Sequence, residues 1–146
     1  HLFRWKGVYF TVYYCFELAD ITHRSLFRSK VDFIVGSEWN KDINYYSNIA
    51  ESASREIHCY FIQVNTSQFG DSRITLPAKT ESKDSVRIKG GVNTTLLVDD
   101  IDIEGLREFQ YKGYNGQKKH KFFKPTPADF NKENVVKRSK NQSFKK

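Results

Sequence analysis

Cys15 is the residue best placed for chemistry, because it ends an aromatic and β-branched run over residues 9–14 that predicts a buried strand. The more polar residues 19–30 that follow predict the start of a helix. A strand-to-helix turn pushes a cysteine sulfur outward, and the amides that open the helix favour a thiolate or a nearby oxyanion. The alternative is a small buried hydrophobic residue at a strand end, since free cysteine is among the most buried residue types.

At 146 residues the chain is long enough for one domain, or part of one, with its own core. It begins at His1 and not at methionine, so we expect the natural N-terminus to lie upstream. No apolar run approaches the roughly 18 residues of a membrane span, and no secretory signal is recognisable. Cys15 and Cys59 both lie in apolar runs rather than in a disulfide framework, so we expect a reduced, cytoplasmic protein with no membrane partner.

Positive charge is concentrated in the last part of the chain. Residues 112–146 carry eleven Lys and Arg against two acidic residues, and the whole chain has a formal net charge of +7. We therefore divide the chain into a body, residues 1–110, and a basic C-terminal arm, residues 111–146, with a partly disordered end. Basic residues interleaved with aromatic ones suit nucleic-acid phosphates and bases; the alternative is a solvated tail that packs on its own domain or on a partner. The candidate nucleic-acid contacts are Lys118, Lys119, Lys121, Lys137 and Arg138.

Compact apolar runs at residues 31–35 and 58–64 predict two further strands. Between them, Asp42 can cap a helix whose apolar residues recur at spacings of three and four. These residues are Ile43, Tyr46, Ile49, Ala50, Ala53 and Ile57. Strands that alternate with helices over short connections predict an α/β fold, and continuous apolar runs are typical of buried parallel strands.

The second half of the body has a different pattern. Short strands are predicted at residues 72–76, 85–89 and 94–98, separated by Pro77 and by the turn at Gly90-Gly91. A last short helix is expected up to residue 109, capped by the aspartate at position 102. A parallel first half and a hairpin-like second half together predict a mixed sheet.

Several landmarks follow Cys15 in order along the body. They are Cys15-Phe16-Glu17 at the first strand end, Gly36-Ser37-Glu38-Trp39-Asn40 after the second, Ala50-Glu51 in the helix, a strand ending at Asn65, Gly70-Asp71-Ser72-Arg73-Ile74 before Pro77, and a last strand that runs into acidic residues over 96–102. In this order they resemble the second half of a carbon–nitrogen hydrolase (nitrilase superfamily) domain, over about residues 8–110.

The resemblance implies a layered α-β-β-α sandwich, of which the body would form the C-terminal half. Cys15 would attack the carbon of a small amide or nitrile substrate and give an acyl-enzyme or a thioimidate, which water then hydrolyses. The amide of Phe16 would stabilise the oxyanion, and Glu38, Trp39 and Asn40 would line the substrate pocket. The family also uses a glutamate base and a lysine from the half before the cysteine, so we expect this chain alone to be inactive.

Structural, non-catalytic interpretations of two of these residues remain open beside the catalytic one. Trp39 also suits ordinary packing in a core or an interface, and Glu38 also suits a solvated loop. No His or Cys cluster has metal-ligand spacing, so we predict no metal, and the chemistry needs no cofactor.

A nitrilase-like half joined to a basic tail also resembles the C-terminal region of the bacterial reverse transcriptases that carry a fused nitrilase domain and act in antiviral defence. The alternative to a hydrolase is a catalytically silent nitrilase-like scaffold in such a protein, serving oligomerisation or the binding of nucleic acid or another partner. A thiol protease or transferase on the same fold is a further option. Because nitrilase-like domains commonly pair through their helical faces, the resemblance also implies a homo-oligomer formed in that way.

Overall fold

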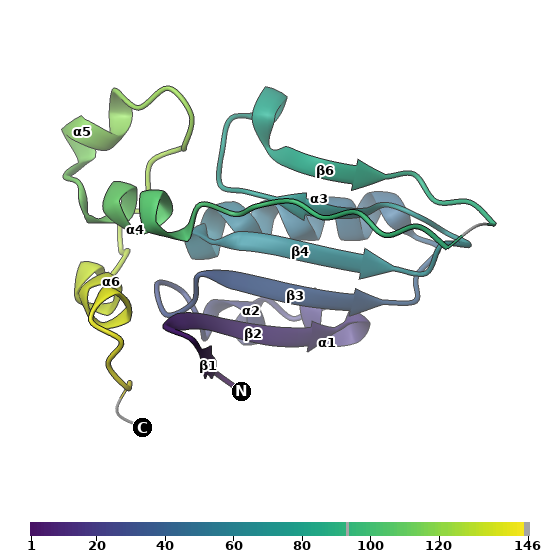
Figure 1. The fold of residues 1–146 in the computed structure, drawn as a ribbon, viewed down its shortest axis with the longest axis horizontal. Coiled ribbons are helices and arrows are strands. Elements are labelled where there is room, and N and C mark those ends of the chain that lie inside the picture. Colours follow the sequence, from purple (N-terminus) through teal and green to yellow (C-terminus); the bar gives the residue numbers. More distant parts are fainter. Residues whose placement is uncertain (93, 145–146) are drawn as a thin grey trace.

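The computed structural model describes residues 1–92 and 94–144, which form one six-stranded sheet with helices around it (Figure 1). The strands are β1 Phe3–Trp5, β2 Val8–Tyr14, β3 Phe33–Glu38, β4 Tyr60–Asn65, β5 Ser72–Thr75 and β6 Asp84–Ile88. The helices are α1 Cys15–Ala19, α2 Ile21–Ser25, α3 Ile43–Ala53, a π-helical turn η1 Ser54–His58, a 3₁₀ turn η2 Thr80–Ser82, α4 Ile103–Tyr111, α5 Tyr114–Lys118 and α6 Lys132–Ser139. Among these described helices, none has the length and apolar character that crossing a membrane requires.

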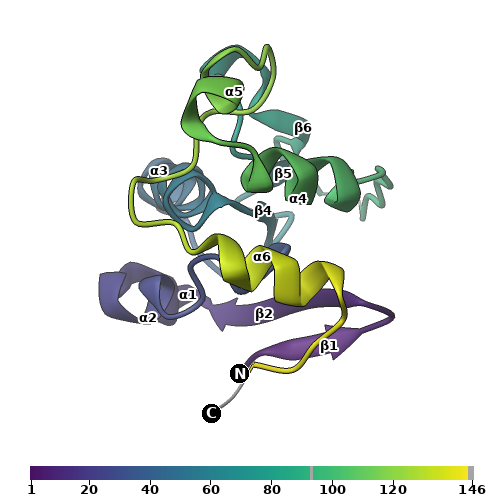
Figure 2. The same ribbon diagram turned by 90° about the vertical axis from the view of Figure 1, so that its left-hand side faces the viewer.

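The sheet is mixed, and its strands lie in the order of the sequence. β2, β3 and β4 are parallel, whereas β1 pairs antiparallel with β2, and β5 and β6 continue antiparallel from β4. The structure thus confirms the α/β class and the mixed sheet predicted from the sequence. Parallel neighbours need crossover connections, and α1 with α2 and then α3 supply them on one face of the sheet (Figure 2). The registers pair Tyr14 with Ser37 and Glu38 with Asn65, so the carboxyl ends of the parallel strands meet at one edge.

The main core lies between the sheet and this helical layer. Its buried members are Tyr13, Leu18, Val31, Ile34, Tyr46, Ile49, Ala50, Ala53, Ile57, Cys59 and Phe61. Alternate residues of each strand point into this core, as the pleat of a strand requires. Gly36 of β3 is needed here, because a Cβ at this position would lie 3.0 Å from the Phe61 ring and 3.1 Å from Leu18.

A second apolar cluster covers the opposite face of the sheet at the end where the parallel strands begin. It consists of Tyr60, Leu76, Ala78, Leu106, Phe109 and Phe123. α4 lies over this end of the sheet (Figure 1). At the other end of the same face, Tyr14 and Val64 stay exposed to solvent.

Residues 94–98, predicted as a strand, are extended but pair with no strand within the described part of the chain. The physical reason lies in the turn before them, where Gly90 has a φ of +107° and the Gly91 N–H donates to the Ser67 carbonyl (2.9 Å). This turn directs the chain out of the plane of the sheet and over its face (Figure 1). The segment therefore forms a partial third layer instead of a seventh strand.

Residues 111–144 pack against the body, which is the alternative that the sequence left open for the arm. α5 and α6 lie at the end of the sheet where the parallel strands begin (Figure 1), and Phe123 and Phe130 are buried. α6 is held by Arg138, whose buried guanidinium forms an ion pair with Asp32 just before β3. The sequence predicted an arm from its excess of basic residues. That excess does not reveal that one of them, Arg138, has a buried acidic partner, Asp32, in the body.

Candidate active site

Cys15 is the first residue of α1 and directly follows the last residue of β2, so it lies at a strand-to-helix turn as the sequence predicts. Its side chain is half-buried and packs against the main core. Because α1 has only five residues, its dipole contributes little at the sulfur. The polar groups that do reach the sulfur come from the neighbouring elements.

Asn40, two residues beyond the end of β3, supplies a hydrogen-bond donor to the thiol. Its Nδ2 lies 3.4 Å from Cys15 Sγ. The contact places an amide N–H against the sulfur that was singled out as a nucleophile. The parallel pairing of β2 with β3 thus brings together two of the residues singled out in the sequence.

Asn65, the last residue of β4, fixes the position of Asn40. Asn65 Oδ1 accepts from the backbone N–H of Asn40 (3.0 Å), and Asn65 Nδ2 donates to the Asn40 carbonyl (2.8 Å). Asn65 is only 7% exposed, so these hydrogen bonds are protected from water. The carboxyl ends of all three parallel strands therefore take part in one small polar cluster.

Tyr46 of α3 approaches Cys15 from the helical layer. Its side chain is buried and lies near the Cys15 side chain. Burial above all, then the neighbouring Cys15 side chain and the negative charge of Glu38, raise the pKa of Tyr46 above its ordinary value. The phenol therefore stays protonated near neutral pH and can donate a hydrogen bond at the site.

Glu38, the last residue of β3, lies buried in a polar network and not in a solvated loop. Its Oε2 accepts from Gln63 Nε2 (3.0 Å), and Gln63 Oε1 accepts from Arg73 Nε (3.0 Å). Its Oε1 has no hydrogen-bond partner among the described residues. Burial, the largest cause, raises the pKa of Glu38 above its ordinary value. The hydrogen bond from Gln63 and the positive charge of Arg73 act in the opposite direction but do not cancel the effect of burial. This network connects β3, β4 and β5 next to the carboxyl edge of the sheet.

Phe16 and Trp39 are both on the surface, with 87% and 77% of their area exposed. The backbone N–H of Phe16 is in the first turn of α1, where the helix itself supplies no acceptor. Trp39 is not part of the core. Two exposed aromatic side chains therefore neighbour Cys15 and Asn40 in the sequence.

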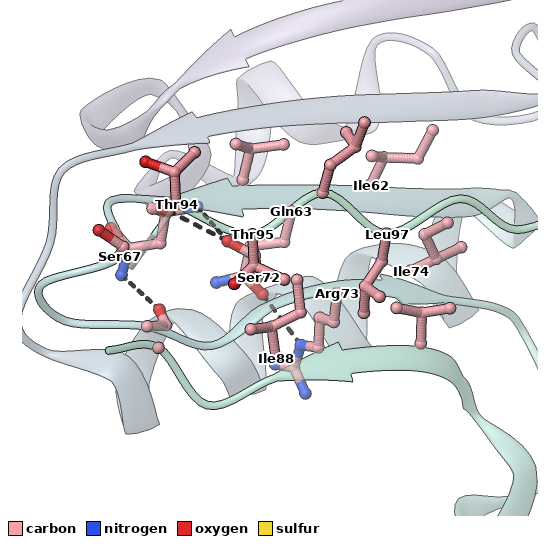
Figure 3. A pocket seen from close by; sticks show the side chains of 16 residues that line it. Ile62, Gln63, Ser67, Ser72, Arg73, Ile74, Ile88, Thr94, Thr95 and Leu97 are labelled. Carbon is pink, nitrogen blue, oxygen red and sulfur yellow. Dashed lines mark hydrogen bonds between the residues drawn. The ribbon is translucent and has the colours of Figure 1, made fainter. Parts of the chain in front are cut away.

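A cavity of about 390 Å³ lies on the face of the sheet opposite the helices, beneath residues 94–97 (Figure 3). Branched aliphatic side chains of the sheet form its walls, and Ser67 and Thr94 lie at one end of it (Figure 3). Cys15 and the residues of the loop after β3 do not line it. Asn65 belongs both to the wall of this cavity and to the cluster around Cys15.

The basic residues proposed to contact nucleic acid lie at the end of the molecule away from α1 (Figure 1). Lys118, Lys119 and Lys121 are exposed at and just beyond the end of α5, and Lys137 of α6 is half-buried. Arg138 is completely buried, and all three of its guanidinium nitrogens are bonded within the protein. Arg138 is thus a structural residue, and the exposed basic surface is restricted to the lysines.

Two residues of the cluster were not recognised as site residues from the sequence. From the sequence, Tyr46 was predicted only to lie on the apolar face of a helix that packs on the core. Asn65 was recognised as the end of a strand, but its partner Asn40 is 25 positions away, and only the parallel register brings them together. Within residues 1–92 and 94–144, no three His, Cys, Asp or Glu side chains are grouped as a metal site.

Comparison of the chain with protein-family models, with curated proteins and with solved structures finds no match. The site combines a half-buried thiol, an amide donor to its sulfur and a protonated phenol, at the edge of the sheet where open α/β folds bind ligands.

Proposed function

We propose that Cys15 is the nucleophile of a carbon–nitrogen hydrolase of the nitrilase type, and that this chain forms the cysteine-bearing half of an α-β-β-α sandwich. The observation that carries the proposal is the 3.4 Å contact between Asn40 Nδ2 and Cys15 Sγ at the carboxyl edge of the parallel strands. The layers support it, since α1, α2 and α3 cover one face of the sheet and leave part of the other face exposed.

The reaction with an amide has two steps. The Cys15 thiolate attacks the carbonyl carbon, the C–N bond breaks, and the leaving amine takes up a proton, which leaves a thioester on the sulfur. Water then attacks the thioester, releases a carboxylic acid and regenerates the thiol. Asn40 stabilises the thiolate before the attack, and the free N–H of Phe16 is available to the oxyanion that forms during it.

The second step needs a general base, which the resemblance assigns to a glutamate, with a lysine beside it, outside this chain. Two acidic residues near the site have partners within the chain: Glu17 accepts from the Tyr14 N–H (2.9 Å), and Glu38 accepts from Gln63 through one of its two carboxylate oxygens. We therefore expect the chain alone to be acylated at Cys15 without sustained turnover.

The test is acyl transfer from an activated aryl acetate, followed by intact-protein mass spectrometry and peptide mapping. We expect one acetyl group, located on Cys15, that forms faster in the folded chain than in the same chain unfolded in urea. Cys15→Ala should abolish the modification. Cys59→Ala is the matched control, because it removes the other thiol from the core and leaves the site intact.

Acetylation that is no faster in the folded chain would contradict the role of Cys15 as a nucleophile and would favour the catalytically silent scaffold. Repeated turnover by the chain alone would contradict the assignment of the base to residues outside it.

A second function, binding of single-stranded nucleic acid, is favoured by one surface at α5. Lys118, Lys119 and Lys121 are exposed there, together with Tyr114 at 63% and Phe122 at 42%. Cationic side chains pair with phosphates, and exposed aromatic rings stack on bases. This surface lies at the opposite end of the sheet from Cys15, so the two functions are separable by substitution (Figure 1).

The test of this second function is the salt dependence of oligonucleotide binding. Replacing Lys118, Lys119 and Lys121 with Glu should lower the slope of log affinity against log salt by about 2, as expected for three lost contacts with single-stranded phosphates. Glu at the exposed Lys6, Lys41 and Lys89 makes the same charge change elsewhere and is the control. Equal losses in both triple variants would show binding by net charge alone.

A further inference from the structure

We infer that Asn65 is the positioning residue of the Cys15 site and that it acts on the sulfur only through Asn40. The inference rests on the proposed role of Cys15 and identifies what holds its hydrogen-bond donor in place. Within the described residues the Asn65 side chain has no hydrogen bond to Cys15, and its four hydrogen bonds all go to the backbone.

The carboxamide of Asn65 uses its full hydrogen-bonding capacity. Its Oδ1 accepts from the N–H groups of Asn40 (3.0 Å) and Thr66 (2.9 Å). Its Nδ2 donates to the carbonyls of Asn40 (2.8 Å) and Gly70 (2.9 Å). A carboxamide has two acceptor positions and two donor hydrogens, so no polar group of this buried side chain is left without a partner.

The Asn65 side chain takes the place of a neighbouring strand for Asn40, which lies just beyond the end of the sheet. The pairing of β3 with β4 stops at Glu38 and Asn65, so the backbone of Asn40 has no neighbouring strand. The Asn65 side chain binds both the N–H and the carbonyl of Asn40, as an adjacent strand would do. Two bonds to one residue's backbone fix its orientation, and the Asp42 N–H, which donates to Asn40 Oδ1 (2.8 Å), then fixes the carboxamide that reaches Cys15.

Only asparagine fits this position. Aspartate accepts hydrogen bonds but, when ionised, cannot donate to the two carbonyls, and glutamine is longer by one methylene. The carbonyl of Gly70 is itself fixed, because Gly70 has a φ of +77° and a Cβ there would lie 1.6 Å from the Lys89 carbonyl oxygen. The loop after β4, Asn65 and Asn40 therefore form one continuous support for the sulfur.

The experiment measures the rate of Cys15 alkylation by iodoacetamide across pH in the full chain and in three variants. Asn40→Ala should move the midpoint of the pH profile upward and lower the rate near neutral pH about tenfold, because a hydrogen bond to a charged group is lost. Asn65→Ala should shift the profile in the same direction. The double variant should shift no further than Asn40→Ala alone, since the effect of Asn65 passes through Asn40.

An additive double variant, or an unchanged profile in Asn65→Ala, would overturn the inference. Asn65→Leu has a similar size, removes the same hydrogen bonds and adds no charge, so it provides a second test, with the same upward shift expected, if the alanine variant does not fold. Asn48→Ala, at an exposed position of α3, is the control and should keep the profile of the unmodified chain. If Cys15 of the unmodified chain reacts no faster than in urea, the proposed function fails; if it reacts fast and the Asn65 variants leave the profile unchanged, only this inference fails.

Discussion

The two cysteines of this chain have opposite surroundings, although both end or begin an apolar run. Cys15 is half-buried and contacts the side-chain amide of Asn40. Cys59 is completely buried in the main core, where burial raises its pKa. The difference comes from position alone, because one thiol lies where a strand ends and the other lies where a strand begins.

His58 is a buried histidine that couples stability to pH. Its ring Nε2 is 2.9 Å from the Lys124 carbonyl, and Gln110 Nε2 is 3.3 Å from its Nδ1. Burial, as the largest cause, lowers the pKa of His58 to about 4, against about 6.5 in an unfolded chain. Between these values the unfolded chain takes up a proton that the folded chain does not, so the folded state loses stability as the pH falls.

We expect His58→Asn to remove this share of the acid sensitivity, which is about 3 kcal/mol in the free energy of unfolding. Asparagine tolerates the φ of +61° at this position, so the backbone needs no rearrangement. Urea unfolding between pH 7 and pH 4 measures the effect. His23→Asn, on the exposed surface of α2, is the control. A His58→Asn variant with the same loss of stability toward pH 4 as the unmodified chain would contradict the assignment.

At the scale of elements, the helical layer sits on the parallel strands with no space to spare at Gly36. Leu18 of α1 and Phe61 of β4 meet above this glycine of β3. α1 follows β2 directly, so Cys15 lies at the turn between them.

Gly36→Ala should destabilise the protein by about 1–3 kcal/mol, because the added methyl group would overpack the core at 3.0–3.1 Å from two side chains. Thermal or urea unfolding measures the change. Gly116→Ala is the matched control: its Cβ would meet only the Lys112 side chain at 3.6 Å, and alanine is the better helix former. Equal effects of the two substitutions would show that the contact at Gly36 is not tight.

At the scale of the whole molecule, Asp32 joins three separate parts of the chain. Its carboxylate accepts from the Tyr9 N–H of β2 (2.8 Å) and from Arg107 of α4 (2.8 Å), and it pairs with Arg138 of α6. Asp32 and Arg138 are both completely buried. Burial, the largest cause, lowers the pKa of Arg138, and the negative charge of Asp32 opposes this effect. The charged form of Arg138 is therefore stabilised by its contact with Asp32.

Asp32→Asn should cost about 3–5 kcal/mol of stability, because it leaves a buried guanidinium without its counter-charge. Arg138→Met should cost less, since Asp32 then keeps Arg107 as a partner. Asp129→Asn removes an acid whose pair with Arg28 is exposed and should cost under about 1 kcal/mol. Chemical unfolding gives all three values, and a smaller effect of Asp32→Asn than of Arg138→Met would contradict the arrangement.

The strands, the long helix and the parallel first half follow from local pattern, because apolar runs and helical spacing are written in neighbouring residues. The turn at Gly90 and Gly91 could also be predicted from the sequence. The sequence did not indicate that this turn leads residues 94–98 over the face of the sheet instead of into it. Docking of the arm depends on the pairing of Arg138 with Asp32, 106 positions apart, which no local pattern records.

The candidate site divides in the same way. Cys15 at its turn was predictable from one stretch of sequence. The contact with Asn40, the support from Asn65 and the approach of Tyr46 all depend on register and packing between elements. Glu38 shows the limit most clearly, since the residue next to an exposed tryptophan is itself buried in a network with Gln63.

The central claim is that the fold activates Cys15, and the most direct test is its rate of alkylation by iodoacetamide from about pH 5 to about pH 9. The folded chain is compared with the same chain in urea, and mass spectrometry reads Cys15 and Cys59 in each sample. We predict that folded Cys15 reacts faster than unfolded Cys15 at the acidic end of this range, while folded Cys59 stays unmodified. Equal or slower reaction of folded Cys15 would contradict the claim and identify it as a packing residue.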